Sequence, residues 1–485
     1  MTGEPGGSLG LHAYRLLATA ATPFLAIHLQ SRVRTGREDC IRWVERWGFT
    51  EETRPNAPLI WFHAVSVGEC AVALPILSRC LKEWPQLNVL FTHGTTTAAS
   101  FLHKHGLPRT ITQYAPFDTP AAVERFMAKW KPQAGIIVES ELWPNLIFAA
   151  HNHQVPLALV NANISPCSTA RWSSALLWPV IHSVLSKFTV ISPQSQGAAR
   201  RLAALGASPE QMTEPLNLKY AAAAAGVSSR ISSQGQSQSQ SQGQGQGKRR
   251  DAWVAASIHP EEEEAVLRAH LQLADKRRGL TTVIAPRHPE RAEAIMQRAR
   301  RLGVPVEVVS GDTAVASFSG GRYEPIGAPA GQPTRSRRAA VMIVNTIGHL
   351  PALYRCCAVA FVGGTLYSGG RGHNLAEAAA AKCAVLCGSH CGPFAEMVSQ
   401  MCANDPRAVW QVADEDELIG AVGRLLQPDE GVHATGPGGE LESRQAAAAA
   451  SFRSLSTDGV EEFWETLKTR LLMHSNLVSH SVLPQ

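Results

Sequence analysis

The sequence lacks the marks of several large classes of protein. Its 10 cysteines are scattered and form no C-x-x-C pair, so neither a paired metal motif nor a secreted disulfide framework is indicated. No dense Lys/Arg stripe alternates with aromatic residues, and we therefore expect no nucleic-acid partner. The scattered thiols favour a reducing compartment.

The chain also lacks a hydrophobic run long enough to cross a membrane. Residues 16–29 are apolar but are interrupted by Pro23, whereas a spanning helix needs about 20 residues. Because arginines follow this run, it fits an anchor that lies in the membrane interface and gives the chain peripheral membrane contact. A cleaved targeting peptide and an ordinary core helix remain open. The arginines are Arg32, Arg34 and Arg37.

One group of residues has the ligand types that suit zinc: Cys383, Cys387, His390 and Cys391. Residues 383–388 also have the pattern of a buried strand that enters a turn, where a free cysteine acts as a small hydrophobe. We favour the strand and expect no metal site.

The composition and the pattern of apolar residues indicate a large α/β protein. With 485 residues, 45% apolar and 18% charged, the chain is globular in composition and long enough for two domains. The net charge of +5 suits an anionic ligand or a membrane surface. Short β-branched segments alternate with helical patterns, which predicts parallel sheets with helices on both faces. The expected strands are residues 58–62, 88–93, 134–138, 156–161, 188–191, 252–256, 281–285, 304–309, 340–344, 359–362 and 384–387.

The alternation breaks near residue 215, where we place a domain boundary. Two Gly-rich segments, about 221–250 and 318–338, cannot bury enough apolar surface to order themselves and are expected to be disordered insertions. Two doubly wound domains would face each other across a central cleft that binds ligands. The expected division is an anchor-like segment (1–50), an acceptor-binding α/β domain (51–215), a second α/β domain (216–455) and a terminal helix and tail (456–485).

Acidic residues follow two strands of the first domain. Glu69 comes after an apolar strand and a Ser/Gly turn, at a strand end where open α/β sheets place their chemistry, and it is the first candidate for a catalytic base. Glu139 and Glu141 follow the strand 134–138 and could bind acceptor hydroxyls or amines. Acids at helix starts also offset the helix dipole, and this structural reading remains open for all three.

Several strand ends of the second domain suit an anion. Ser257 and His259 precede a helix start whose N–H groups could cradle a phosphate. Arg287 and His288 end the next strand, and arginine suits bidentate phosphate contact. No Walker motif and no G-x-G-x-x-G in a first βαβ unit occurs, which argues against a dinucleotide dehydrogenase. Further candidates at turns and helix starts are Gly348, Gly364, Asn374 and Glu377.

In this order the segments resemble the bacterial-type 3-deoxy-D-manno-octulosonic acid (Kdo) transferase family, glycosyltransferases of the GT-B fold. The resemblance covers nearly the whole chain, and the order of segments is more specific than any one of them. The matching residues are 45–49, 63–69, 139–145, 217–219, 257, 259, 286–291, 361–365, 372–374 and 377.

The resemblance implies an inverting transfer of Kdo from CMP-Kdo to a lipid A precursor, such as a lipid IVA-like acceptor, without a metal or other cofactor. Glu69 would be the general base. On the acceptor side it implies Ser66, Gly68, Glu139 and Glu141. On the CMP-sugar side it implies Lys219, Ser257, His259, Arg287, His288, Gly348, Gly364, Asn374 and Glu377.

The Gln/Ser/Gly insertion suggests a plant or algal member, for which the resemblance implies a mitochondrial location. A bacterial member would be associated with the cytoplasmic face of the inner membrane. Two alternatives remain open: another GT-B enzyme that uses a UDP-sugar, and a non-catalytic descendant that binds a nucleotide or a membrane. The second is permitted because the family's acids at positions 345 and 349 are replaced by Asn345 and His349.

Overall fold

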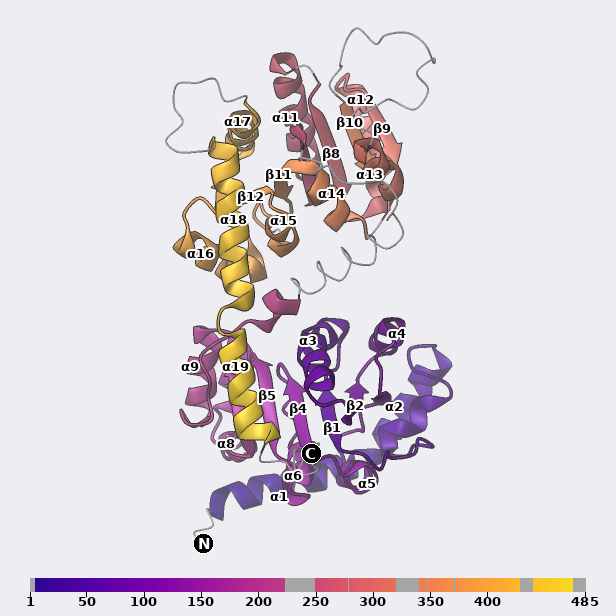
Figure 1. Cartoon of the computed structure of the whole chain (residues 1–485). Helices are drawn as coiled ribbons and strands as arrows, with labels where there is room; N and C mark the ends of the chain where they lie inside the picture. The colour runs from indigo at the N-terminus through magenta and orange to yellow at the C-terminus, as the bar shows by residue number, and fades with distance from the viewer. Residues whose placement is uncertain are drawn as a thin grey trace, which may run out of the picture. The chain divides into compact units, whose positions relative to one another are not determined.

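The computed structural model describes residues 5–222, 249–277, 279–319, 340–346, 348–369, 372–427 and 439–473 (Figure 1). The chain divides into two compact units, residues 1–222 with 457–485 and residues 223–456. The two expected insertions lie almost wholly outside the described residues.

The first unit contains a six-stranded parallel sheet in the order β3-β2-β1-β4-β5-β6. Five of its strands were predicted within two residues at either end. β3 was missed because the segment TITQY is polar and only its last two residues are buried, as befits a sheet edge. The strands are β1 (Leu59–His63), β2 (Asn88–His93), β3 (Thr110–Tyr114), β4 (Ala134–Val138), β5 (Leu157–Ala162) and β6 (Phe188–Pro193).

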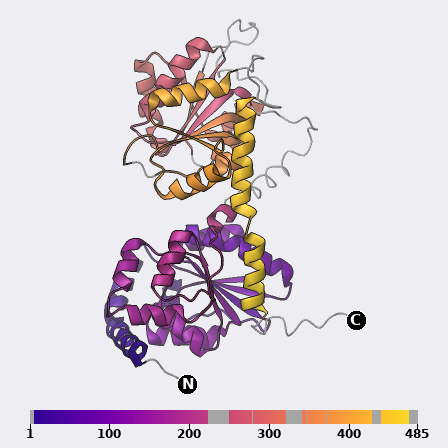
Figure 2. The same ribbon diagram turned by 90° about the vertical axis from the view of Figure 1, so that its left-hand side faces the viewer.

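Helices cover both faces of this sheet (Figure 2). On one face α3 and the C-terminal helical residues share a core with the strands, including Phe463, Trp464 and Leu467. On the other face α5, α6 and α8 pack around Trp61. The helices after β1 are α3 (Val67–Glu83), α4 (Thr96–His105), α5 (Pro120–Trp130), α6 (Pro144–Asn152), α7 (Pro166–Trp172), α8 (Trp178–Leu185), α9 (Gln196–Ala204), α19 (Val460–Leu467) and η4 (Lys468–Leu472).

The N-terminal apolar run forms parts of two helices, α1 (Pro5–Ala20) and α2 (Thr22–Arg34), and Pro23 lies in the first turn of α2, where proline is favoured because its missing N–H costs no hydrogen bond. α1 packs on the first unit, where the Tyr14 hydroxyl donates to Asp118 Oδ2 at 2.8 Å. A short 3-10 helix, η1 (Arg42–Trp47), follows. No helix in the described part of the chain is long and apolar enough to span a membrane.

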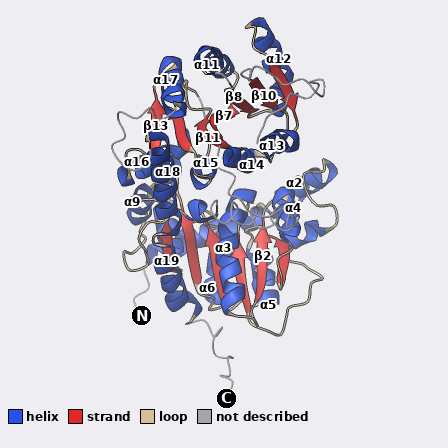
Figure 3. Ribbon diagram, turned by 45° about the horizontal axis from the view of Figure 1, so that its top comes forward, coloured by secondary structure: helices blue, strands red, loops and turns tan. Residues whose placement is uncertain are grey.

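The second unit contains a seven-stranded parallel sheet in the order β13-β12-β11-β7-β8-β10-β9, flanked by helices (Figure 3). Its six expected strands are present, and the half-buried edge strand β13 was missed. The strands are β7 (Arg249–Ile258), β8 (Thr281–Pro286), β9 (Val306–Val309), β10 (Ala340–Val344), β11 (Cys357–Val362), β12 (Ala384–Gly388) and β13 (Val409–Val412). The helices are α11 (Glu263–Lys276), η2 (Pro289–Arg291), α12 (Ala292–Arg301), α13 (Gly311–Ser319), α14 (Leu350–Cys356), α15 (Ala376–Ala380), η3 (Gly392–Phe394), α16 (Ala395–Asn404), α17 (Glu415–Leu426) and α18 (Glu440–Thr457).

Each sheet has a point at which the strand order reverses. In the first unit β1, β2 and β3 run to one side and β4, β5 and β6 to the other, so the reversal lies between β1 and β4. In the second unit it lies between β7 and β11. Crevices at the carboxyl ends of strands at such switch points are the usual ligand sites of doubly wound sheets. The predicted fold class of two doubly wound α/β units is confirmed.

Candidate functional site

Glu69 lies in the first turn of α3, directly after β1 at the switch point of the first unit. Ser66 is the N-cap of α3, and its Oγ accepts the N–H of Glu69 at 3.4 Å. The Glu69 carboxylate accepts the Val65 N–H at 2.7 Å on Oε2 and the Ser66 hydroxyl at 2.8 Å on Oε1. This is the S-x-x-E capping arrangement, so the side chain is held in one orientation by the start of its own helix.

The environment of Glu69 keeps its proton affinity high. Burial raises the pKa of the carboxyl above its ordinary value, the Val65 and Ser66 hydrogen bonds oppose that rise, and the charge of Glu139 adds to it. A carboxylate with a raised pKa is a better proton acceptor at neutral pH than an exposed one. Gly68, beside it, is exposed in the first turn of α3.

Two further acids approach Glu69 from the end of β4, across the switch point. Glu139 has a positive φ of 63°, a conformation that is rare for a residue with a side chain and common at functional sites. Glu141 accepts the indole N–H of Trp143 at 2.6 Å. Burial raises the pKa of Glu141, the Trp143 bond opposes the rise, and the charges of Glu69 and Glu139 add to it. The structure therefore brings the three predicted acceptor-side acids into one electrostatic group.

Lys219 belongs to this group and not to the second unit, where the sequence placed it. Its Nζ lies 2.7 Å from Glu139 Oε1. The segment around it packs on the first unit, since Leu218 is buried there and donates its N–H to Asn161 Oδ1 at 3.0 Å. The chain therefore passes to the second unit after residue 222, later than the expected 215.

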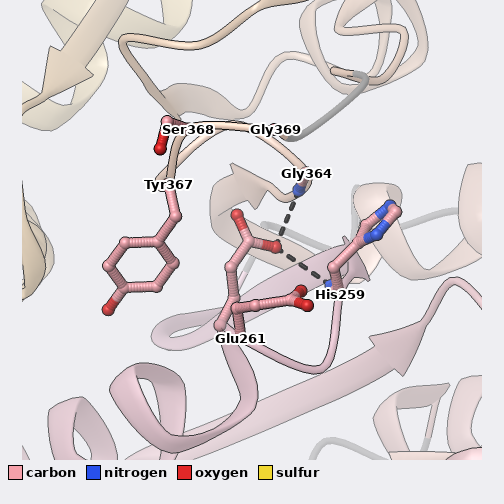
Figure 4. Close-up of a pocket in the computed structure, with 7 residues that line it drawn as sticks. His259, Glu261, Gly364, Tyr367, Ser368 and Gly369 are labelled. Carbon is pink, nitrogen blue, oxygen red and sulfur yellow. Dashed lines mark hydrogen bonds between the residues drawn. The ribbon is translucent and has the colours of Figure 1, made fainter.

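The second unit has a pocket of about 230 Å³ at its own switch point (Figure 4). Predicted residues His259, after β7, and Gly364, after β11, both line it. Gly364 has a φ of 70°, and a side chain there would press on the rings of His373 and His259. The lining residues are His259, Glu261, Glu262, Gly364, Tyr367, Ser368 and Gly369.

The backbone N–H groups of this pocket are arranged differently from the prediction. Residues after Ser257 were expected to cradle a phosphate with N–H groups. Instead the buried carboxylate of Glu262 accepts the N–H of His259 at 3.0 Å and that of Gly364 at 2.7 Å, drawn as dashed lines in Figure 4. The N–H of His259 is therefore taken by Glu262, and the prediction of a phosphate cradle is corrected for this one group.

Two imidazoles meet beside the pocket. His259 Nε2 and His373 Nε2 lie 2.9 Å apart, so one ring donates and the other accepts. Burial, together with the nearby His259, Arg287 and His288, lowers the pKa of His373 to about 4, and the charge of Glu262 opposes this fall. Arg287 and His288 are exposed at the end of β8, beside β7.

The remaining predicted residues have local roles in the second unit. Ser257 has a φ of 55° at an irregularity in the pairing of β7 with β8. Gly348, with a φ of 95°, precedes α14, and β10 before it is two strands from β7. Asn374 Oδ1 accepts the N–H of Ala376, the first residue of α15, at 2.9 Å, and α15 carries Glu377 in its first turn.

Sequence reasoning did not select five of the lining residues, Glu261, Glu262, Tyr367, Ser368 and Gly369, or His373, whose ring contacts the lining residue His259. Glu262 stands in a run of four glutamates that was read as one helix start, and nothing in the sequence separates the buried member from its neighbours. His373 stands in a segment that had been noticed, and its contact with His259 depends on the pairing of β7 with β11.

The expected strand at the cysteine cluster is confirmed as β12. Cys383 and Cys387 are buried, and Cys387 Sγ lies 3.6 Å from Cys391 Sγ. Among the residues that the structure describes, no group of three or more His, Cys, Asp or Glu side chains could hold a metal ion.

The fold places the chain among α/β proteins built from two doubly wound units, which bind their ligands at the switch points of the sheets. A solved UDP-GlcNAc 2-epimerase from Neisseria meningitidis, bound to UDP-GlcNAc, shares the fold with a TM-score of 0.51 at 12% identity, over 84% of this chain and 99% of that one. Residues 41–222 match the family model described as 3-Deoxy-D-manno-octulosonic-acid transferase (kdotransferase).

Curated relatives identify the family more closely. The chain is 36% identical over 468 residues to the probable mitochondrial 3-deoxy-D-manno-octulosonic acid transferase of Arabidopsis thaliana, covering 96% of this chain and 97% of that protein. It is 28% identical to the 3-deoxy-D-manno-octulosonic acid transferase of Haemophilus influenzae, covering 80% and 84%. The chain belongs to the Kdo transferase family and is a glycosyltransferase.

Proposed function

We propose that the chain transfers Kdo from CMP-Kdo to a lipid A precursor, with inversion and with no metal ion in the chemical step. The observation that carries this proposal is the position of Glu69, oriented at the switch point of the first unit with its pKa raised by burial. Family membership supports the donor and the acceptor class.

In the proposed reaction Glu69 takes the proton of an acceptor hydroxyl as that oxygen bonds to the anomeric carbon of Kdo. The bond between this carbon and the CMP phosphate oxygen breaks, and CMP leaves with the electron pair. Arg287, which lies near His373, is a described cation suited to the phosphate charge, and the imidazole of His259 lines the pocket beside it. Lys219 is ion-paired with Glu139 and limits the repulsion among the acids around the base. We also propose that Asn374 and Glu377 contact the ribose or the phosphate of CMP-Kdo.

The general-base assignment is tested by Glu69→Gln in a transfer assay with CMP-Kdo and a tetraacylated disaccharide acceptor. The variant should lose at least about a hundredfold in turnover, as removal of general base catalysis does, and should still bind CMP. Glu124→Gln is a matched control, because Glu124 is an acid of the same unit whose ion pair with His153 lies on the surface. Retained turnover in Glu69→Gln would refute the assignment. Stabilisation of the chain by UDP and not by CMP would refute the donor.

We also propose that α1 and α2 contact a membrane surface. Four large apolar side chains are exposed on these two helices, Leu16 by 72%, Leu17 by 70%, Phe24 by 74% and Ile27 by 67%. Exposed apolar side chains followed by arginines are typical of helices that lie in the membrane interface. A mitochondrial location is supported by the description of the plant relative.

The membrane proposal is tested by flotation with vesicles that contain anionic lipid. The double substitution Leu17→Ser with Phe24→Ser should reduce the bound fraction severalfold. Ile41→Ser, at a residue that is 79% exposed outside both helices, should leave it unchanged. Equal flotation of the double variant and the wild type would count against an interfacial role for α1 and α2.

A further inference from the structure

Glu262 has an environment that its neighbours in the glutamate run do not share. Glu262 is 2% exposed, and its carboxylate accepts hydrogen bonds from four backbone N–H groups. Oε2 accepts those of His259 at 3.0 Å and Gly364 at 2.7 Å. Oε1 accepts those of Thr365 and Leu366, both at 3.0 Å. A buried charge that accepts several N–H bonds is satisfied without a cation.

These bonds join two loops that are far apart in sequence and adjacent in the sheet. His259 belongs to the turn between β7 and α11, whereas Gly364 to Leu366 follow β11. The two strands flank the switch point and pair in parallel. One carboxylate therefore fixes both walls of the pocket, and through His259 it also fixes the imidazole that contacts His373.

We propose that Glu262 is a positioning residue of the donor site: it binds four backbone N–H groups at the switch point and thereby sets the position of the two loops that form the pocket. The carboxylate holds the two loops together in the absence of donor. The identity of the donor in this inference rests on the proposed function. The role of Glu262 in ordering the loops is independent of the proposed function.

The substitution Glu262→Gln tests the charge at nearly constant size. An amide has one oxygen in place of two, so two of the four N–H groups lose their acceptor and face the new NH₂ group instead. One wall of the pocket should then be released. We expect CMP to bind at least about tenfold more weakly, and the KM for CMP-Kdo to rise more than kcat falls.

Glu263→Gln is the matched control. Glu263 is the next residue, equally buried, and forms a bidentate pair with Arg291 at 2.6 and 3.1 Å that ties α11 to η2. It does not line the pocket. Its loss should lower the melting temperature about as much as the loss of Glu262, but it should leave CMP affinity within about twofold. CMP titration by calorimetry together with thermal unfolding of each variant measures both quantities.

Amide hydrogen exchange separates this inference from the proposed function. In the wild-type chain the amides of Gly364, Thr365 and Leu366 should be protected without any nucleotide, and Glu262→Gln, but not Glu263→Gln, should remove that protection. If the wild type fails to bind CMP while this pattern holds, the proposed donor is refuted and the role of Glu262 stands. Unprotected amides in the wild type would overturn the inference, and so would CMP affinity in Glu262→Gln equal to that of the wild type. If Glu262→Gln does not fold, Glu262→Asp takes its place in both measurements and the same outcomes apply.

Discussion

A buried neutral histidine in each unit should make stability fall as the pH is lowered. His63, at the end of β1, donates from Nδ1 to Thr92 Oγ1 at 2.9 Å, because that oxygen already donates to the carbonyl of Phe62 at 3.1 Å. Its buried Nε2 has no hydrogen-bond partner among the described residues. A second proton on the ring would therefore have no acceptor, and burial lowers the pKa of His63 to about 4.

The sign and size of the effect follow from proton linkage. As the pH falls below about 6.5 the unfolded chain takes up a proton on His63, whereas the folded chain does so only near pH 4. The stability contributed by the neutral ring is present above pH 6.5 and is lost as the pH falls to 4. The shift of about 2.5 units corresponds to about 3 kcal/mol over the whole window, of which about 2 kcal/mol is lost between pH 7 and pH 5.

The assay is guanidinium unfolding at pH 7 and pH 5, followed by far-ultraviolet circular dichroism. Replacing His63 by Gln should remove about 2 kcal/mol from the pH dependence of the first unit's transition. His270 is the counterpart in the second unit: burial lowers its pKa to about 4, and its Nδ1 lies 2.8 Å from Thr282 Oγ1. His270→Gln should act on the other transition only. If His63→Gln and the wild type lose equal stability between pH 7 and pH 5, the buried neutral ring is not the cause.

Two further predictions concern the first unit. Ser66→Ala removes the cap of α3, so thermal unfolding should show a loss of about 1 kcal/mol in stability. It also removes a hydrogen bond that lowers the pKa of Glu69, so the acid limb of the pH–activity profile should move to higher pH. An unmoved acid limb would mean that Glu69 does not titrate in that profile. Leu467→Ala should destabilise the first unit by about 2 to 5 kcal/mol in denaturant unfolding, because this side chain is fully buried in its core. An effect confined to the second unit's transition would contradict the assignment of residues 457–485 to the first unit.

The predicted strands show what local pattern can and cannot determine. Central strands such as β1 and β4 are buried on both faces and have continuous apolar sequences, so their positions were evident. The edge strands β3 and β13 bury only part of their length and carry polar residues that resemble loops. Strand order, which creates the switch points, depends on pairings between distant segments and has no local signal.

The candidate site residues also differ in how much of their role local sequence can reveal. Glu69 and Glu139 were found because both follow buried strands, Glu139 directly and Glu69 after a short turn. Lys219 was assigned to the wrong unit because the sequence does not show where its neighbour Leu218 binds. The N–H of Leu218 donates to Asn161 Oδ1 at the end of β5, 57 residues earlier in the sequence. Glu262 was missed because its importance lies in bonds to a loop more than 100 residues away.

The capping role of Glu69 and its proposed catalytic role are compatible in physical terms. An ionised carboxylate can accept about four hydrogen bonds, and the Val65 N–H and the Ser66 hydroxyl use one position on each oxygen. A lone pair remains on either oxygen for the proton of an acceptor hydroxyl. The two bonds also restrict rotation of the side chain, which reduces the entropy that a base must lose when it engages its substrate. The helix start is therefore the support that a base at this position needs, and the same bonds that explain Glu69 structurally prepare it for proton transfer.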